Sequence, residues 1–181
     1  SLTYLQCFRD KRTSGDPHCK QVVALGDSQS VAISGDGRSV YATGGSTSTL
    51  VSFARNTKTG KLTPAGCLTS SSSADNAACA PAPVLDGANR LLLSPNGLRL
   101  FVAAEQSFAV TEFARDPRTG KLREVSCIGG DDNFVNAACT AGRAIRSPQS
   151  MTLSPDGKQL YVTVTQGIVT LLVDPVSGEL S

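Results

Sequence analysis

The 181-residue sequence predicts an all-β fold, and three observations lead to that prediction. Short apolar runs alternate with polar residues at a period of two, which is the pattern of half-buried strands. Sequences typical of tight turns, such as Ser154-Pro155-Asp156-Gly157, separate these runs. The same hairpin sequence recurs in register at Ser34, Ser94 and Ser154, so the chain repeats itself with a period of about 60 residues.

The residue types of each hairpin turn explain its shape. In the third copy, Pro155 presets φ at the second position and Asp156 can bond nearby backbone groups. Gly157 takes the left-handed conformation that a hairpin with a bulge requires. We expect the first two strands of the three units, with their turns, at Val31–Gly44, Leu91–Ala104 and Met151–Val164.

Each unit is expected to contain two further strands. The third strand occupies Thr49–Ala54, Ala109–Ala114 and Ile168–Val173, and a second turn follows it at Asn56–Lys61, Asp116–Lys121 and Asp174–Glu179. The fourth strand opens with Leu62, Leu122 or Leu180. Four short antiparallel strands in each repeat are typical of the blades of a β-propeller. We therefore predict three four-stranded blades in one segment, residues 1–181, with repeat units 1–60, 61–120 and 121–181.

Three blades do not close an ordinary propeller, since closed rings typically hold roughly four to eight. Two arrangements remain open: further blades of the same polypeptide, about six or seven in total, or an oligomer with a second copy of the chain. Ser1–Thr3 aligns with Lys61–Thr63, so the chain starts in an outermost strand, and Glu179–Ser181 opens another. This overlap favours the longer polypeptide. In a head-to-tail dimer, the N-terminal residues of one chain and the C-terminal residues of the other would occupy the same positions of one strand.

The sequence "LSPDGKQLYVT", followed by a V-x-x-[FV]-x-x-D-P-x-[TS]-G-x-L segment, resembles the YVTN, or lactonase-like, family of β-propellers. The resemblance covers all three units. It implies a propeller fold, in a family that includes lactonases, which open sugar lactones, and relatives described as cyclases. The matched residues form turns and strands, so the resemblance carries over no catalytic residue.

Six cysteines occur in two phases of the repeat, and each unit holds one pair. Six cysteines allow fifteen connectivities. The repeat selects three of the possible bridges, Cys7–Cys19, Cys67–Cys79 and Cys127–Cys139. Metal binding is the weaker alternative, because each unit offers two thiols and His18 is the single histidine of the chain. Disulfides in every unit indicate an oxidising compartment, so we expect a secreted or cell-surface location.

The cysteine loops differ in sequence while the scaffold around them repeats, and they are expected on the face opposite the tight turns. Loops on a rigid scaffold commonly carry binding sites, so we predict a protein or carbohydrate ligand on this face. The candidate ligand-binding residues are Asp16, His18, Asp75, Asn76, Asp131, Asp132 and Asn133. The alternative is that the loops only cap the edges of the blades.

No catalytic motif or metal site is predicted. His18 lies in a bridged loop, where a solvated histidine is commoner than a general base. Asp131 and Asp132 could hold Ca²⁺ together with Asn133, yet a Gly-Asp-Asp-Asn turn needs no metal. The sequence contains no Ser-His-Asp arrangement, phosphate-binding glycine loop or zinc motif, so we expect no cofactor.

Charge and hydropathy exclude two further classes of partner. The net charge of +2 gives no reason to expect nucleic acid, and no apolar run is long enough to predict a membrane span. The sequence thus favours an extracellular, disulfide-stapled propeller module for binding or structural assembly. The alternative is a lactonase- or cyclase-type hydrolase whose active site needs blades outside this chain.

Overall fold

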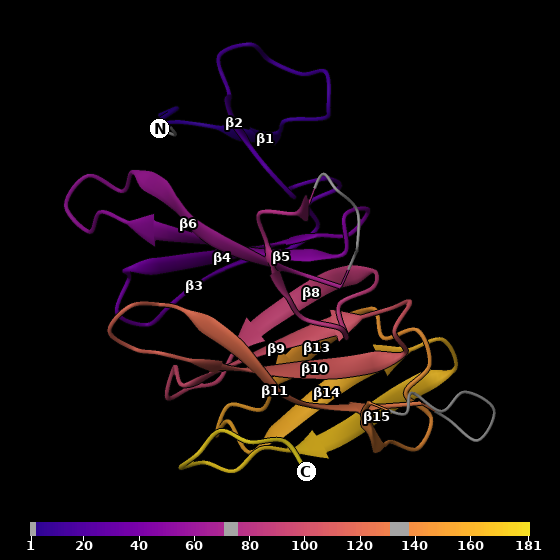
Figure 1. The fold of residues 1–181 in the computed structure, drawn as a ribbon. Coiled ribbons are helices and arrows are strands. Elements are labelled where there is room, and N and C mark those ends of the chain that lie inside the picture. Colours follow the sequence, from indigo (N-terminus) through magenta and orange to yellow (C-terminus); the bar gives the residue numbers. More distant parts are fainter. Residues whose placement is uncertain (1–2, 71–75, 131–137) are drawn as a thin grey trace.

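The structure, a computed structural model, describes residues 3–70, 76–130 and 138–181. Within these ranges the chain forms β-strands and no α-helix. Three sheets follow one another from the N-terminal to the C-terminal end of the molecule, as blades of a propeller do (Figure 1). The predicted all-β propeller fold is confirmed.

Sheet 1 contains β3 (Val31–Ile33), β4 (Ser39–Gly44), β5 (Thr49–Arg55), β6 (Leu62–Thr69) and β7 (Ala80–Pro81). Sheet 2 contains β8 (Ala88–Leu93), β9 (Arg99–Ala104), β10 (Ala109–Arg115), β11 (Leu122–Gly129) and β12 (Thr140–Ala141). Sheet 3 contains β13 (Ser150–Leu153), β14 (Gln159–Val164) and β15 (Gly167–Leu172), and a bridge joins Val173 to Leu180. At the N-terminal end, β1 (Phe8–Asp10) pairs with β2 (Lys20–Val22).

The strand count of the sheets differs from the four predicted for each unit. Sheets 1 and 2 each have a fifth, two-residue strand, which pairs in parallel with the outermost strand of the meander. The disulfide explains this addition, because it brings the chain after the second cysteine back beside the first. The residue after that cysteine pairs with the residue after the first, as in Phe8↔Lys20 and Leu68↔Ala80.

The hairpin turns have the conformation expected from their sequences. Gly37, Gly97 and Gly157 have φ of 68°, 69° and 70°, in the left-handed region that glycine adopts without strain. In the first turn, the Ser34 hydroxyl accepts a hydrogen bond from the Ser39 N–H at 3.0 Å. The repeated serine therefore closes the hairpin through its side chain.

Apolar side chains from neighbouring sheets form the core. Between sheets 1 and 2, the core includes Tyr41, Leu100 and Phe113, each fully buried. Between sheets 2 and 3, Phe101 packs against Leu160. Sheet 2 is therefore buried on both faces, since Leu100 and Phe101 are neighbours on one strand and point to opposite sides.

The N-terminal segment covers the remaining face of sheet 1 over β4 and β5, and leaves Val31 and Ile33 of β3 68% and 51% exposed. Val22 and Ala24 pack with Val40 and Phe53 in one cluster, and the rings of Phe8 and Phe53 lie 5.0 Å apart. The segment thus takes the place that a neighbouring sheet occupies elsewhere in the structure.

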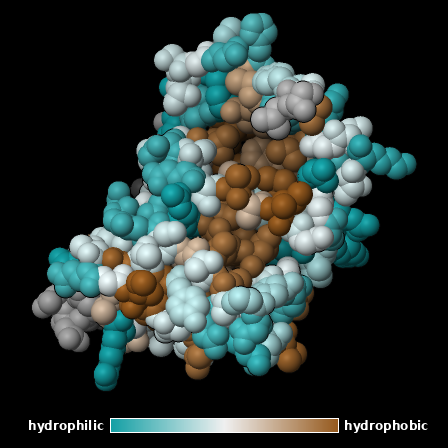
Figure 2. Space-filling view, turned by 180° about the vertical axis from the view of Figure 1, so that it is seen from behind, coloured by the Kyte–Doolittle hydropathy of each residue, from teal (hydrophilic) through white to brown (hydrophobic). Residues whose placement is uncertain are grey.

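The outer face of sheet 3 is apolar and exposed. Tyr161, Ile168 and Leu172 are 39%, 70% and 57% exposed. In the repeat, Tyr161 corresponds to Phe101 and Ile168 to Val110, and both of those side chains are fully buried. Seen from behind, the molecule also shows an apolar band between polar margins (Figure 2).

Candidate functional site

The three disulfide-closed loops occupy equivalent places in the repeat. The structure contains the bridges that the repeat predicts, Cys7–Cys19, Cys67–Cys79 and Cys127–Cys139, with Cα–Cα distances of 4.8, 4.7 and 4.8 Å. The described residues include no free cysteine. Each bridge holds its loop at the end of an outermost strand, so the loops can differ in sequence without changing the sheet.

The first loop exposes two of the predicted ligand-binding residues as a pair. The Asp16 carboxylate accepts a hydrogen bond from the His18 backbone N–H at 2.8 Å, and the ring Nδ1 lies 2.8 Å from the same oxygen. These bonds lower the pKa of Asp16. The His18 and Asp16 side chains are 85% and 61% exposed, so both remain accessible to a ligand.

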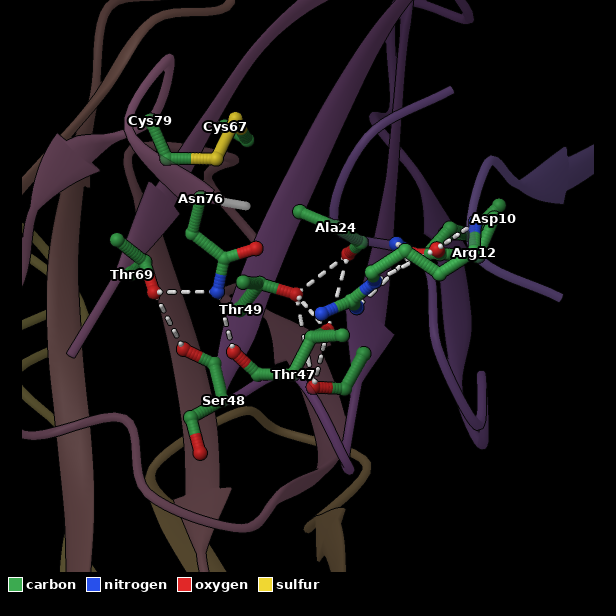
Figure 3. The surroundings of a disulfide bond; sticks show 12 residues. Asp10, Arg12, Ala24, Thr47, Ser48, Thr49, Cys67, Thr69, Asn76 and Cys79 are labelled. Carbon is green, nitrogen blue, oxygen red and sulfur yellow. Dashed lines mark hydrogen bonds and ion pairs between the residues drawn. A yellow bond between two sulfur atoms is a disulfide. The ribbon is translucent and has the colours of Figure 1, made fainter. Parts of the chain in front are cut away.

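The second loop is anchored by a buried amide (Figure 3). Asn76 is 2% exposed, and its Nδ2 donates to the Thr47 carbonyl at 3.0 Å and to Thr69 Oγ1 at 3.3 Å. Its Oδ1 accepts no hydrogen bond from any residue that the structure describes. Asn76 therefore fixes the loop on the turn between β4 and β5, and a ligand contact by this residue stays a prediction.

The polar network beneath the loop continues into the N-terminal segment. The hydroxyls of Thr47 and Thr49 both donate to the Ala24 carbonyl. The neighbouring Asp10 is 2% exposed and accepts bonds from the Arg12 side chain at 2.9 Å and from the Leu25 N–H at 2.7 Å. Burial raises the pKa of Asp10, but the bonds from Arg12 and Leu25 lower it to about 2.

Sequence reasoning did not single out Asp10. In the repeat its position is taken by Ser70 in the second unit and Gly130 in the third. The sequence did hold one indication of its role: a carboxylate occurs at this position in only one of the three units.

The other predicted site residues, Asp75, Asp131, Asp132 and Asn133, lie outside the described residues. Across the described part of the chain, no three His, Cys, Asp or Glu side chains come together in an arrangement that could hold a metal ion. In the same ranges no helix is long and apolar enough to cross a membrane. The described part of the site thus consists of small disulfide-closed loops over a polar network.

Comparison with known proteins supports the propeller fold. No protein-family model and no curated protein matches the sequence. Among solved structures, a putative 6-phosphogluconolactonase from Bacteroides fragilis is 20% identical with a TM-score of 0.68, and the match covers 93% of this chain and 41% of that one. The periplasmic gluconolactonase PpgL of Pseudomonas aeruginosa is 22% identical with a TM-score of 0.64, covering 90% and 39%.

A β-propeller domain of Cps50 (Swd1) from Myceliophteria thermophila is 12% identical with a TM-score of 0.52, and the match covers 85% of this chain and 42% of that one. The chain thus spans about two fifths of the length of the solved structures it matches. Identities of this size establish the architecture only. The chain adopts a β-propeller fold that is also found in gluconolactonases.

Proposed function

We propose that this chain is part of an extracellular β-propeller module that binds a protein or carbohydrate, or assembles with one, through its disulfide-closed loops. One observation carries the proposal: three loops of different sequence are stapled at equivalent positions of one repeated scaffold. Such a design holds variable side chains on a rigid frame, which is the usual arrangement of a binding surface.

The bridges also support the proposed location. Disulfides persist in oxidising compartments and are rare in the cytosol. Three of them in a chain of 181 residues fit a secreted or cell-surface protein. The turn motif "LSPDGKQLYVT" supports a YVTN-type propeller as the finer family assignment.

Further blades, or a second copy of the chain, are proposed as partners at the outer face of sheet 3. The exposure of Tyr161 and Ile168 supports this, because the equivalent Phe101 and Val110 are buried by the next sheet.

A lactonase-type hydrolase is the second candidate. It is favoured by the names of two solved structures with this fold, one a putative 6-phosphogluconolactonase and the other a periplasmic gluconolactonase. The match covers 41% and 39% of those chains, so the active site of such an enzyme would use blades outside this sequence.

The test uses the purified chain on an array of immobilised neutral and acidic oligosaccharides and on extracellular matrix proteins. We expect binding that His18→Ala, or replacement of Asp131-Asp132-Asn133 by Ala-Gly-Ala, weakens about tenfold, which corresponds to roughly 1.4 kcal/mol. The matched control is Val176→Ala on an exposed tight turn, which should leave binding unchanged.

Two results would contradict the proposal. One is binding that survives both loop variants, and the other is binding that the control weakens as much. Hydrolysis of gluconolactone by the longest natural form, with no loop-dependent binding, would favour the second candidate.

A further inference from the structure

Sheets 1 and 2 separate at their outer rim and leave a groove of about 930 Å³ between β5–β6 and the turn that joins β10 to β11. We call this the basic groove. Its lining includes the cations Arg38, Lys58, Arg118 and Lys121 and, in the described part of the chain, no carboxylate. None of these four side chains forms an ion pair with another described residue.

The equivalent space between sheets 2 and 3 is filled by a buried carboxylate. Glu112 is 1% exposed and accepts bonds from Arg99 Nε at 2.7 Å, from the Ser126 hydroxyl at 2.7 Å and from the Leu180 N–H at 3.3 Å. Arg99 also pairs with Glu179 at 2.7 Å. An internal anion and its partners thus close that interface.

The repeat shows what replaces this network in the basic groove. Ser52 stands at the position of Glu112, Ser39 at that of Arg99 and Gly66 at that of Ser126. All three residues line the groove and are smaller than their counterparts. Lys121 stands at the position of Glu179, so the charge at this point is reversed.

The backbone N–H groups at one position of the repeat also differ between the groove and its equivalents. The Leu180 N–H meets the Glu112 carboxylate, and the equivalent Leu62 N–H meets the Gln6 side-chain oxygen at 3.0 Å. The third equivalent, the N–H of Leu122, receives no side-chain acceptor from the residues with described positions, and Leu122 lines the groove. Where two copies of the repeat supply an oxygen, the copy in the groove supplies none.

Carboxylates near the groove offset its charge only in part: Asp116 interacts electrostatically with Arg118, and Glu124 lines an adjoining hollow. Asp36 binds Arg115 at 3.2 Å, and Asp116 accepts the backbone N–H groups of Arg118 and Thr119 at 2.8 and 2.9 Å. Asn56 stands where the second and third units have Asp116 and Asp174, which removes one more negative charge from this side.

We propose that the basic groove binds an acidic oligosaccharide, with one anionic oxygen placed where the Glu112 carboxylate lies in the next interface. That oxygen accepts from the Leu122 N–H and pairs with Lys121, while Arg118, Lys58 and Arg38 face further anionic groups. The volume suits a ligand of several rings rather than a single ion, because pockets of about 300–1,000 Å³ hold drug-sized molecules. Repeating carboxylates or sulfates along a saccharide match cations spread along a groove. The groove borders the second stapled loop, since Cys67 and Ala80 line it, but its four cations lie outside the stapled loops.

Calorimetric titration of the purified chain tests the proposal with four ligands of equal length: oligogalacturonate, a heparin-derived oligosaccharide, a neutral cello-oligosaccharide and single-stranded DNA. We expect binding of one or both acidic saccharides, which distinguishes carboxylate from sulfate, and none of the neutral one. Ser52→Glu, which restores the internal carboxylate, and Lys121→Glu should each weaken binding at least about tenfold.

The matched control is Lys61→Glu, which changes the exposed lysine at the equivalent position of the preceding repeat, outside the groove. It should weaken binding clearly less than Lys121→Glu does, because Lys61 is exposed and does not line the groove. Thermal melts followed by circular dichroism verify that each variant is folded. If Ser52→Glu does not fold, the surface variant Lys121→Glu alone tests the groove.

Four results would overturn the proposal. These are no acidic saccharide binding, unchanged affinity in folded groove variants, an equal loss in Lys61→Glu, or DNA binding as tight as that of the saccharides. The last would show a general polyanion surface. Because Lys121 and Ser52 lie outside the stapled loops, a failure here leaves the loop-binding proposal standing.

Discussion

The two interfaces between sheets bury similar apolar side chains but use different polar groups at the rim. Between sheets 2 and 3, a charged pair, Arg99 and Glu112, fills the space. Between sheets 1 and 2, the Tyr41 hydroxyl donates to the Gly120 carbonyl and accepts from Arg115 Nε, both at 2.8 Å, and the buried Arg115 pairs at 3.2 Å with Asp36, whose side chain is 34% exposed. The apolar pattern thus stacks the sheets, and a few polar residues decide whether the rim is closed or open.

The largest effect is expected for Glu112→Ala, which leaves Arg99 without its buried partner. Removing one member of a buried ion pair typically costs roughly 3–5 kcal/mol. We expect a loss of this size in the free energy of unfolding from urea denaturation. Ser52→Ala, at the same position of the open interface, should change it by less than about 0.5 kcal/mol. Equal losses in both variants would show that the interfaces do not differ in this way.

A smaller loss is expected for Tyr41→Phe in the other interface. The variant removes one hydroxyl and leaves the Gly120 carbonyl and Arg115 Nε without this partner. An unsatisfied buried group costs about 1–3 kcal/mol, so the urea midpoint should fall accordingly. Tyr161→Phe, with its side chain partly exposed, serves as the control and should leave the midpoint unchanged.

The pH dependence of stability should include a contribution from Asp36. Bonds from the Ser34 hydroxyl, the Arg38 N–H and the Arg115 guanidinium lower its pKa from 3.8 to about 2. Because the folded-state pKa is the lower one, Asp36 stabilises the fold above pH 3.8, and this is lost as the pH falls toward 2.

We therefore expect melting temperatures between those pH values to fall less steeply in Asp36→Asn than in the original chain. Part of the slope should remain, since Asp10 also has a pKa of about 2. Parallel curves for the two proteins would rule out a contribution from Asp36.

The smallest effect is expected for Asn56→Asp, which gives the first turn the acidic residue of the second. Asn56 Oδ1 already accepts from the Lys58 and Thr59 N–H groups at 3.0 Å, as Asp116 does in its own turn. The free energy of unfolding should change by less than about 0.5 kcal/mol. A larger change would mean that charge in this turn matters to the fold as well as to the groove.

The fold was largely predictable because its signals are local. Glycine at a left-handed turn position, as at Gly157, and alternating apolar residues define each hairpin without knowledge of the rest. The fifth strand was not predictable in this way. It forms because the closed cysteine loop places Ala80 beside Leu68, a pairing that neither residue type indicates.

The ligand-binding role of the candidate site residues stays a prediction, and the structure shows only how the described ones are placed. Asp16 and His18 are exposed as expected, whereas Asn76 is buried as an anchor, and loop sequences without periodicity do not distinguish these two roles. The burial of Glu112 depends on partners in two sheets, including the Leu180 N–H, which are distant in sequence. The contrast between Ser52 and Glu112 was visible in the repeat, but its meaning needed the interface.

The short parallel strands also bear on colloidal behaviour. An outermost strand with free backbone groups can pair with strands of other molecules and start aggregation. After the second and third disulfides, the returning chain occupies part of that edge. The Ala82 N–H donates a hydrogen bond to the Thr69 carbonyl at 2.8 Å, and the Gly142 N–H donates one to the Gly129 carbonyl at 2.9 Å. Farther along β6, Pro64 has no N–H to offer. Each bridge therefore helps to cover an exposed strand edge. A reducing agent should make the protein prone to aggregation before it changes the packing between sheets.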